Sequence, residues 1–187
     1  MASQSPARRD LMKKLEVPFH TCASYYAEDM TLKMGAEELV VFLAVEKARA
    51  VAEKYPYSIV IGADTFGTFQ EKKLGKPQSS EEAREMFEAM SGGKVGVHTG
   101  VGFLQTNERG HVVELVKVYD VSWISFKRFS QEVIEDLVRK PYVLEVAGGI
   151  KIEDMGHLVE KIEGDYDNII GLPIYKMRPV ISAFLRD

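Results

Sequence analysis

The chain has 187 residues, 45% hydrophobic and 28% charged, which is typical of one globular domain and excludes a disordered or collagen-like chain. Its 24 Lys and Arg against 28 Asp and Glu give a formal net charge of −4, which argues against a protein that coats nucleic acid or anionic membranes. No apolar run reaches the roughly 20 residues of a membrane helix, and the single cysteine, Cys22, cannot form an intramolecular disulfide. We therefore expect one cytoplasmic domain over residues 1–187, with no nucleic-acid or membrane partner.

Hydrophobic spacing divides the chain into helices and strands. Apolar residues that recur every three or four positions predict helices, and apolar or alternating β-branched runs predict strands. In chain order we expect a helix over 7–15, an extended segment over 19–23, a helix over 36–55, a strand over 58–63, a helix over 79–90, a strand over 95–103, one or two strands over 112–126, a helix over 130–139, short strands over 143–152 and 157–162, and a helix over 173–185. This order predicts a mixed α/β fold with helices packed on a central, partly antiparallel sheet.

Two charged residues stand where packing alone would not place them. Lys47 lies in the middle of the apolar stripe of the helix over 36–55, so it either extends to solvent or meets a buried anionic partner. Asp64 is expected at the carboxyl end of the strand over 58–63, where ligands of α/β sheets gather and a carboxylate can hold a metal or orient water. The alternative for Asp64 and Thr65 is a simple turn after the strand.

The segment from Ser3 to Arg9 places two hydroxyls and two guanidiniums at the start of a helix. Free backbone N–H groups and the helix dipole favour an anion there, so Ser3, Ser5 and Arg8 can hold a phosphate chain with help from Arg9. Alternatively, Ser5 is only an N-cap and the arginines are solvated.

Other signals are weaker or absent. Lys76 lies on a rigid Gly-Lys-Pro turn, where a solvated lysine is the default, and the adjacent Glu28 and Asp29 are a weak acidic candidate. The four histidines have no metal-ligand spacing. The sequence also lacks G-x-x-x-x-G-K-[ST], G-x-G-x-x-G, H-E-x-x-H and G-x-S-x-G, so the common nucleotide-binding and hydrolase signatures do not apply.

Taken in order, these pieces resemble one family, the Maf-type nucleoside triphosphate pyrophosphatases. The resemblance covers almost the whole chain, and its strength lies in the series rather than in any one motif. The motifs are Ala2-Ser3-Gln4-Ser5-Pro6 with Arg8, Glu28, Leu43-Ala44 with Lys47-Ala48, Gly62-Ala63-Asp64-Thr65, Gly75-Lys76-Pro77, Ser91-Gly92, Thr99-Gly100-Val101, Ala147-Gly148, Gly164-Asp165-Tyr166 and Gly171-Leu172-Pro173.

The resemblance implies hydrolysis of a nucleoside triphosphate between its α- and β-phosphates, with the help of a divalent metal, typically Mg²⁺. Asp64 matches the catalytic acidic residue, as proton acceptor or metal ligand, and Glu28 matches the acidic residue that shares the metal. Lys47 and Lys76 match two lysines that balance triphosphate charge. The family's phosphate-holding loop corresponds to Ser3, Ser5 and Arg8, with Arg9 beside them.

The implied fold is a mixed α/β sheet in an elongated, two-lobed single domain with a cleft, similar to inosine triphosphatases and commonly a homodimer. Base selectivity is marked at three positions, which here hold Ala7, Thr65 and Glu153. The dTTP/UTP branch has an arginine at the first, a threonine at the second and a glutamine at the third, whereas the 7-methyl-GTP branch has an aromatic residue, a glutamine and a glutamate. The markers disagree, and the charge of Glu153 against a cationic methylated purine favours 7-methyl-GTP.

Two functions from different classes remain open at this stage. The first is a house-cleaning nucleotide pyrophosphatase, and the second is a non-catalytic nucleotide-binding regulator of cell division. The enzyme is favoured by the joint retention of Glu28, Asp64, Lys47 and Lys76, because binding alone tolerates the loss of a carboxylate. A globular domain whose polar residues are only structural is the third alternative.

Overall fold

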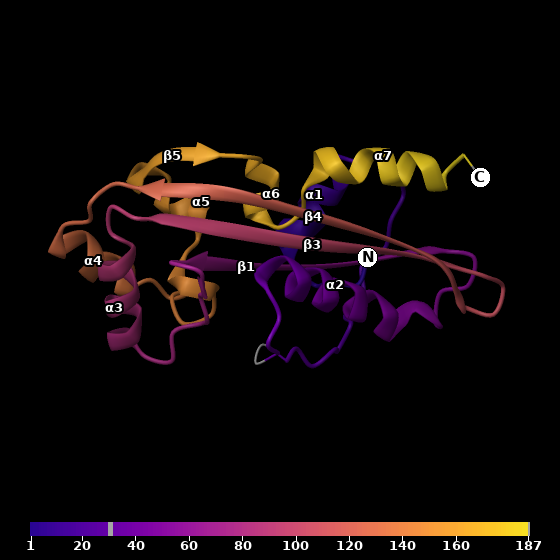
Figure 1. The fold of residues 1–187 in the computed structure, drawn as a ribbon, viewed down its shortest axis with the longest axis horizontal. Helices are drawn as coiled ribbons and strands as arrows, with labels where there is room; N and C mark the ends of the chain where they lie inside the picture. The colour runs from indigo at the N-terminus through magenta and orange to yellow at the C-terminus, as the bar shows by residue number, and fades with distance from the viewer. Residues whose placement is uncertain (30–31, 187) are drawn as a thin grey trace. The chain divides into compact units, whose positions relative to one another are not determined.

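The computed structural model describes residues 1–29 and 32–186 (Figure 1). Within these residues five strands form one sheet in the order β2-β1-β3-β4-β5. The strands are β1 (Ile59–Phe69), β2 (Lys72–Lys73), β3 (Lys94–Thr106), β4 (Val112–Phe126) and β5 (Val159–Glu163). The α-helices are α1 (Pro6–Lys13), α2 (Ala36–Ala52), α3 (Ser80–Met90), α4 (Gln131–Val138), α5 (Ile152–Met155), α6 (Tyr166–Ile170) and α7 (Ile174–Phe184), with short 3-10 turns η1 (Ala147–Gly149) and η2 (Gly156–Leu158).

The chain divides into two compact units that share the three long strands β1, β3 and β4. Unit 1 comprises Met1–Thr65, His98–Asp120 and Asp167–Asp187, and unit 2 comprises Phe66–Val97 and Val121–Tyr166. The sheet is extended at its two edges by antiparallel pairing of β1 with β2 and of β4 with β5. No helix among the described residues is both long enough and apolar enough to cross a bilayer.

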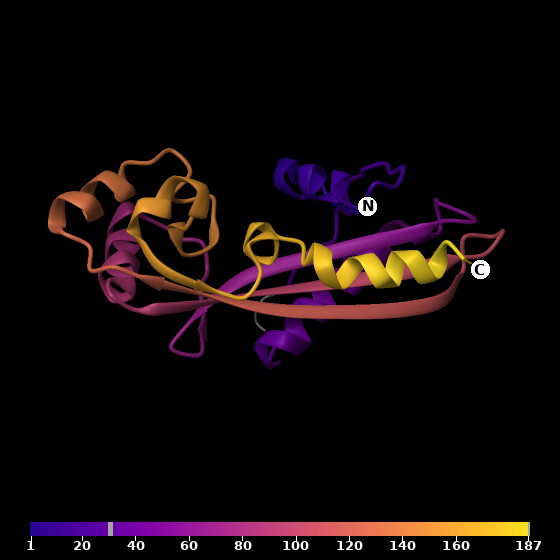
Figure 2. The same ribbon diagram turned by 90° about the horizontal axis from the view of Figure 1, so that it is seen from above.

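In unit 1, helices cover both faces of the strands (Figures 1 and 2). Successive side chains of a strand point to opposite faces, so β1 contributes Ile61 and Ala63 to one side and Val60 to the other. Ile61 packs in a cluster with buried residues of α1 and α7, such as Met12 and Met177. Val60 packs instead against the last turns of α2. This alternation decides which face of the sheet Asp64 shares.

Helix α2 lies unusually close to the strands because glycines face it. A Cβ built on Gly62 would lie 2.7 Å from the backbone nitrogen of Ala48 and closer still to the carbonyl oxygen of Ala44. Gly100 and Gly102 of β3 face the same helix in the same way. The lysine and carboxylates described below depend on this close approach, because it brings α2 within reach of a short aspartate side chain.

We expect Gly62→Ala to lower the free energy of unfolding by about 3 kcal/mol or more, because the new methyl group meets helix backbone that cannot move aside. The measurement is the urea midpoint of the purified variant. Gly156→Ala is the control, since nothing lies within 4 Å of its Cβ position, and it should stay within about 0.5 kcal/mol of the original chain. Equal midpoints for the two variants would contradict the packing argument.

In unit 2, α3 and α4 pack beside each other and are joined by a forked ion pair. Arg84 donates from Nη2 to Glu135 Oε2 at 3.1 Å and from Nη1 to Glu135 Oε1. Phe87 of α3 and Phe126 at the end of β4 are fully buried in this unit. Both α3 and α4 begin at serine N-caps, Ser79 and Ser130, whose side chains accept the backbone N–H groups of Glu82 and Val133.

Most of the expected elements are confirmed, and the mixed α/β fold with them, but three differences matter. The strand expected over 143–152 is wrong: turns, η1 and α5 occupy this stretch, because Gly148 and Gly149 adopt left-handed backbone with φ of 64° and 66°. The range 112–126 forms one strand, β4, and not two. Strand β1 runs on to Phe69, so Asp64 lies in the middle of this strand and not at its carboxyl end.

Candidate active site

Asp64 and Lys47 form a buried ion pair within unit 1. Asp64 shares the strand face of Gly62, which is the face that α2 covers, and Lys47 extends from α2 toward it. Lys47 Nζ donates to Asp64 Oδ1 at 2.6 Å, and the two side chains are only 11% and 7% exposed. The lysine in the apolar stripe therefore has a buried anionic partner, the second of the two possibilities that its position allowed.

Glu28 supplies a second carboxylate to the same ammonium. Its Oε1 lies 2.7 Å from Lys47 Nζ, and its side chain is 41% exposed. One cation thus bridges a buried carboxylate and a carboxylate that reaches solvent. The net charge of the three groups is −1, so the cluster can accept a further cation or give up one carboxylate–lysine contact when a ligand enters.

The start of α1 places Arg8 in the same unit. Ser5 is the N-cap, and its Oγ accepts the backbone N–H of Arg8 at 3.4 Å, while Ser3 Oγ accepts the N–H of Ser5 at 3.2 Å. Ser5 is therefore an N-cap, as expected from the alternative to a phosphate-binding role for this segment. Arg8 is not simply solvated, however, because its guanidinium turns inward from the helix.

Two acceptors hold the Arg8 guanidinium. Its Nε donates to the carbonyl of Gly171 at 3.1 Å, and its Nη2 donates to Thr65 Oγ1 at 3.0 Å. Burial lowers the pKa of Arg8, and the charges of Asp64 and Glu28 oppose that shift. A guanidinium remains charged even so. The arginine thus presents a fixed positive charge next to the carboxylate cluster.

Arg8, Lys47 and Glu28 line a cavity of about 240 Å³ in unit 1. Its walls combine the Arg8 guanidinium, the Lys47 ammonium and the Glu28 carboxylate with small polar residues from the first segment of the chain. A concave space lined by two cations and a carboxylate suits a small polyanion. The cavity lining is completed by Ala2, Ser3, Gln4, Ala23, Ser24 and Tyr25.

Comparison with known proteins agrees with this chemistry. A family model described as Maf-like protein matches residues 1–184. The chain belongs to the Maf family. The resemblance carried by the motif series is therefore confirmed over nearly the whole chain.

Several curated relatives of this Maf chain are named dTTP/UTP pyrophosphatase. A protein from Geobacillus sp. strain WCH70, named dTTP/UTP pyrophosphatase, is 38% identical over 93% of this chain and 91% of its own length. A protein of the same name from Bacillus cytotoxicus is 34% identical over 98% of this chain and 94% of its own. Among solved structures, a HAM1 protein from Coxiella burnetii has a TM-score of 0.53 at 13% identity, covering 97% of this chain and 96% of that chain. The last comparison supports the mixed α/β fold alone.

The remaining residues that the Maf resemblance singled out lie outside the ion-pair cluster. Arg9 is exposed on α1, where Nη2 donates to Thr21 Oγ1 at 3.4 Å, and Ala7 is half-buried on the same helix. Lys76 and Glu153 belong to unit 2, where both are exposed. Unit 1 thus brings together Glu28, Lys47, Asp64 and Arg8, with Ser3, Ser5 and Thr65 beside them.

Sequence reasoning missed two features of the site. Tyr25 lines the cavity although the residue is 90% exposed, and its backbone φ of 51° lies in the left-handed region that such residues rarely adopt. The signal in the sequence that could have indicated Tyr25 is the pair of adjacent tyrosines, Tyr25 and Tyr26, in a polar stretch. The second feature is a chain of hydroxyls from Thr65 to Thr99, which no local pattern indicates.

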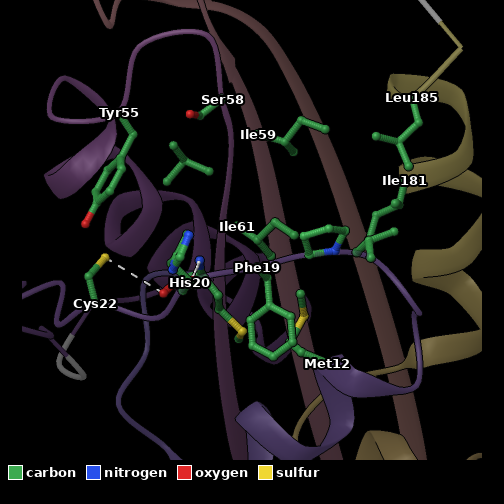
Figure 3. Close-up of a pocket in the computed structure, with 14 residues that line it drawn as sticks. Met12, Phe19, His20, Cys22, Tyr55, Ser58, Ile59, Ile61, Ile181 and Leu185 are labelled. Atoms are coloured by element: carbon green, nitrogen blue, oxygen red, sulfur yellow. Dashed lines mark hydrogen bonds between the residues drawn. The ribbon is translucent and has the colours of Figure 1, made fainter.

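A second cavity in unit 1, of about 300 Å³, differs in character from the first (Figure 3). Figure 3 shows Met12, Phe19, Ile61 and Ile181 pointing into it, and Cys22 at its edge. Cys22 Sγ lies 3.8 Å from the carbonyl oxygen of Met1. Among the described residues that line this cavity there is no lysine or arginine, so it does not suit a polyphosphate.

Proposed function

We propose that this chain hydrolyses dTTP and UTP to the nucleoside monophosphate and pyrophosphate. The observation that carries the proposal is the ammonium of Lys47, held between Asp64 and Glu28 on the wall of a cavity that Arg8 also lines. Such a site can bind a polyanion and stabilise negative charge that develops on a leaving group. Relatives at 34% and 38% identity that are named dTTP/UTP pyrophosphatase support the reaction class.

Asp64 acts as the proton acceptor in this proposal. Its carboxylate takes a proton from a water that attacks the α-phosphorus, the bond from that phosphorus to the bridging oxygen breaks, and pyrophosphate leaves with that oxygen. Lys47 already donates to Asp64 Oδ1, so its ammonium lies beside the base and can also balance charge on the departing pyrophosphate. No covalent nucleophile is required for this reaction.

The amino-terminal segment binds phosphate oxygens. Arg8 supplies the fixed guanidinium, and Ser3 and Ser5 supply hydroxyls at the start of α1. Arg9 is placed on the exposed side of the same helix, where it adds to the positive potential that attracts a nucleotide. Lys76 is the second lysine that the family resemblance assigns to the triphosphate.

The carboxylates fit a divalent cation that arrives with the nucleotide. Glu28 and Asp64 each place an oxygen within 2.7 Å of one nitrogen, so they are close enough to share one ion. Among the described residues no group of three or more His, Cys, Asp or Glu side chains could hold a metal, and Mg²⁺ is commonly held by one or two carboxylates plus substrate phosphates. When bound, the ion would neutralise charge on the phosphate oxygens.

For the base, two observations favour thymine and uracil. Thr65 carries the dTTP/UTP marker and is hydrogen-bonded to Arg8, whereas Glu153, the marker that favours 7-methyl-GTP, lies exposed in unit 2. Both relatives are named for dTTP and UTP. The preference for 7-methyl-GTP expected from Glu153 finds no support among these relatives, so we propose the pyrimidine nucleotides instead.

The proposed activity is tested by pyrophosphate release from dTTP, UTP, CTP, GTP, ITP and 7-methyl-GTP, with chromatography of the nucleotide product. We expect kcat/KM for dTTP and UTP to exceed that for 7-methyl-GTP by about tenfold or more. Chelation of Mg²⁺ with EDTA should abolish turnover and leave the Tm of the free protein unchanged, because two carboxylates alone make a weak metal site.

The competing role is a nucleotide-binding regulator without turnover. Folded protein that binds dTTP in a titration but releases no pyrophosphate with Mg²⁺ would favour that role. Release of orthophosphate in place of pyrophosphate would contradict the proposed bond cleavage, and a clear preference for 7-methyl-GTP would restore Glu153 as the better marker.

A further inference from the structure

A chain of four polar groups connects the Arg8 guanidinium to the backbone of α6. Arg8 Nη2 lies 3.0 Å from Thr65 Oγ1, Thr65 Oγ1 lies 3.0 Å from Thr99 Oγ1, and Thr99 Oγ1 lies 3.0 Å from the carbonyl oxygen of Asn168. All four residues belong to unit 1. Thr99 is fully buried, so its hydroxyl cannot exchange these partners for water.

The direction of every hydrogen bond in this chain is determined by its two ends. The carbonyl of Asn168 can only accept, so Thr99 must donate its one hydroxyl proton there. Thr99 therefore accepts from Thr65, whose proton is used in turn. The oxygen of Thr65 is left with lone pairs only, and it accepts from Arg8. A hydroxyl in the opposite orientation would point a proton at the guanidinium.

This chain of hydrogen bonds, the Thr65–Thr99 relay, leaves some N–H groups of the Arg8 guanidinium without a partner in the described part of the free protein. Arg8 uses Nε for the Gly171 carbonyl and one proton of Nη2 for Thr65, and among the described residues Nη1 has no hydrogen-bond acceptor. Gly171 allows this approach, because a Cβ there would lie 3.3 Å from Arg8 Nε. The guanidinium lines the polar cavity that Lys47 and Glu28 share. The two hydrogen bonds thus leave Nη1 and one proton of Nη2 for a ligand that enters this cavity.

We propose that Thr99 is a positioning residue: its buried hydroxyl orients Thr65 as an acceptor and so fixes the Arg8 fork for a phosphate oxygen of the substrate. The inference rests on the proposed function for the identity of the substrate, but its core, anion binding by an oriented arginine, does not require turnover. Thr99 itself touches no ligand. Its effect therefore appears through Arg8 and requires an intact hydroxyl.

The test compares Thr99→Val with Thr99→Ser. Valine keeps the shape of threonine and removes the hydroxyl, so KM for dTTP should rise about tenfold while kcat changes by less than about threefold. Serine keeps the hydroxyl and should return KM to within about twofold of the original value. A rise in KM that is equal for valine and serine would overturn the proposal, because it would show that packing of the methyl group is what matters.

Thr106→Val is the matched control. Thr106 lies on the same strand, is also buried, and its hydroxyl likewise contacts backbone carbonyls, those of Tyr55 and Ser58. The two valine variants should lose similar stability in urea, but only Thr99→Val should change KM. An equal rise in KM for Thr106→Val would show that loss of a buried hydroxyl weakens substrate binding through general destabilisation.

A double-mutant cycle shows whether Thr99 changes KM by positioning Arg8 or by an effect that does not involve Arg8. In an Arg8→Lys background, Thr99→Val should change KM by less than about twofold, because lysine lacks the planar fork that the relay orients. If the two substitutions multiply their effects, Thr99 does not act through Arg8 and the proposal fails.

Thr99→Val and Thr106→Val can also be compared without turnover. The measurement is the binding of inorganic triphosphate by calorimetry in the absence of Mg²⁺. Thr99→Val should raise its Kd about tenfold, and Thr106→Val should not. This measurement still tests the positioning role if no nucleotide is hydrolysed, a result that would overturn the proposed function alone. Original protein that binds no triphosphate, or a Kd unaffected by Thr99→Val, would overturn the positioning role.

Discussion

Asp64→Asn is expected to reduce kcat for dTTP hydrolysis by about 10³-fold while the protein remains folded. Asparagine keeps the size of the side chain and an oxygen that can accept from Lys47, but it cannot take a proton from water. It also removes one of the two carboxylates available to a metal. The measurement is the initial rate of pyrophosphate release at saturating dTTP and Mg²⁺, with the urea midpoint as the check on folding.

Asp120→Asn is the matched control for this variant. Asp120 is also a buried strand aspartate of unit 1, and its Oδ1 lies 2.6 Å from the ammonium of Lys176, as Asp64 Oδ1 lies from Lys47. The two substitutions remove the same charge from similar surroundings, so a general cost of neutralising a buried aspartate appears in both. Asp64 is not the base if Asp64→Asn keeps more than a tenth of the original kcat. The same conclusion follows if Asp120→Asn loses as much kcat as Asp64→Asn does.

The periodic parts of the fold are predictable because their sequence signal is local. The helix expected over 36–55 is observed as α2 over Ala36–Ala52, and Lys47 stands out since it interrupts an apolar stripe. The motif series places Lys47, Asp64 and Glu28 in one site, although these residues are far apart in the chain. Chain pattern alone indicates each residue singly, and only the family resemblance groups them.

The extent of an element is harder to predict where its pattern changes midway. The apolar run of β1 stops before Asp64 and predicts that the strand stops there too, yet the strand continues to Phe69. The buried carboxylate is tolerated in mid-strand because α2 supplies a cation from the facing helix. The pairing partner lies 17 residues earlier in the sequence, so no window along the strand contains the reason.

The positioning of Arg8 lies beyond any sequence pattern. Two of its supports are a backbone carbonyl, that of Gly171, and a hydroxyl, that of Thr65, whose orientation depends on Thr99. Backbone carbonyls carry no residue-type signal, and a threonine in a strand is ordinary. The glycine after α6 belongs to one of the family motifs, but its contact with the arginine is formed only in the folded chain.

Lys47→Met is expected to lower the free energy of unfolding by about 3–5 kcal/mol at pH 7, besides abolishing turnover. Methionine fills the volume of the lysine stem on an apolar stripe, so packing is largely kept. Asp64, however, would keep its carboxyl group at a site that is 5% exposed and would lose the ammonium that it contacts. Glu28 can turn its carboxylate to water, since its side chain is 41% exposed, but the mid-strand aspartate has no such freedom.

The double variant Lys47→Met/Asp64→Asn tests the cause of that loss. It removes the buried charge together with its cation, and replacing a buried ion pair by neutral groups is often close to neutral for stability. We therefore expect urea midpoints that recover most of the loss, with activity still absent. If the double variant is no more stable than Lys47→Met alone, the cost comes from lost lysine packing in α2, and the ion pair contributes little to holding the helix against β1. Recovery of stability without activity would instead separate the two roles of Lys47: neutralising a buried carboxylate in the free protein, and supplying positive charge to the phosphate chain during the reaction.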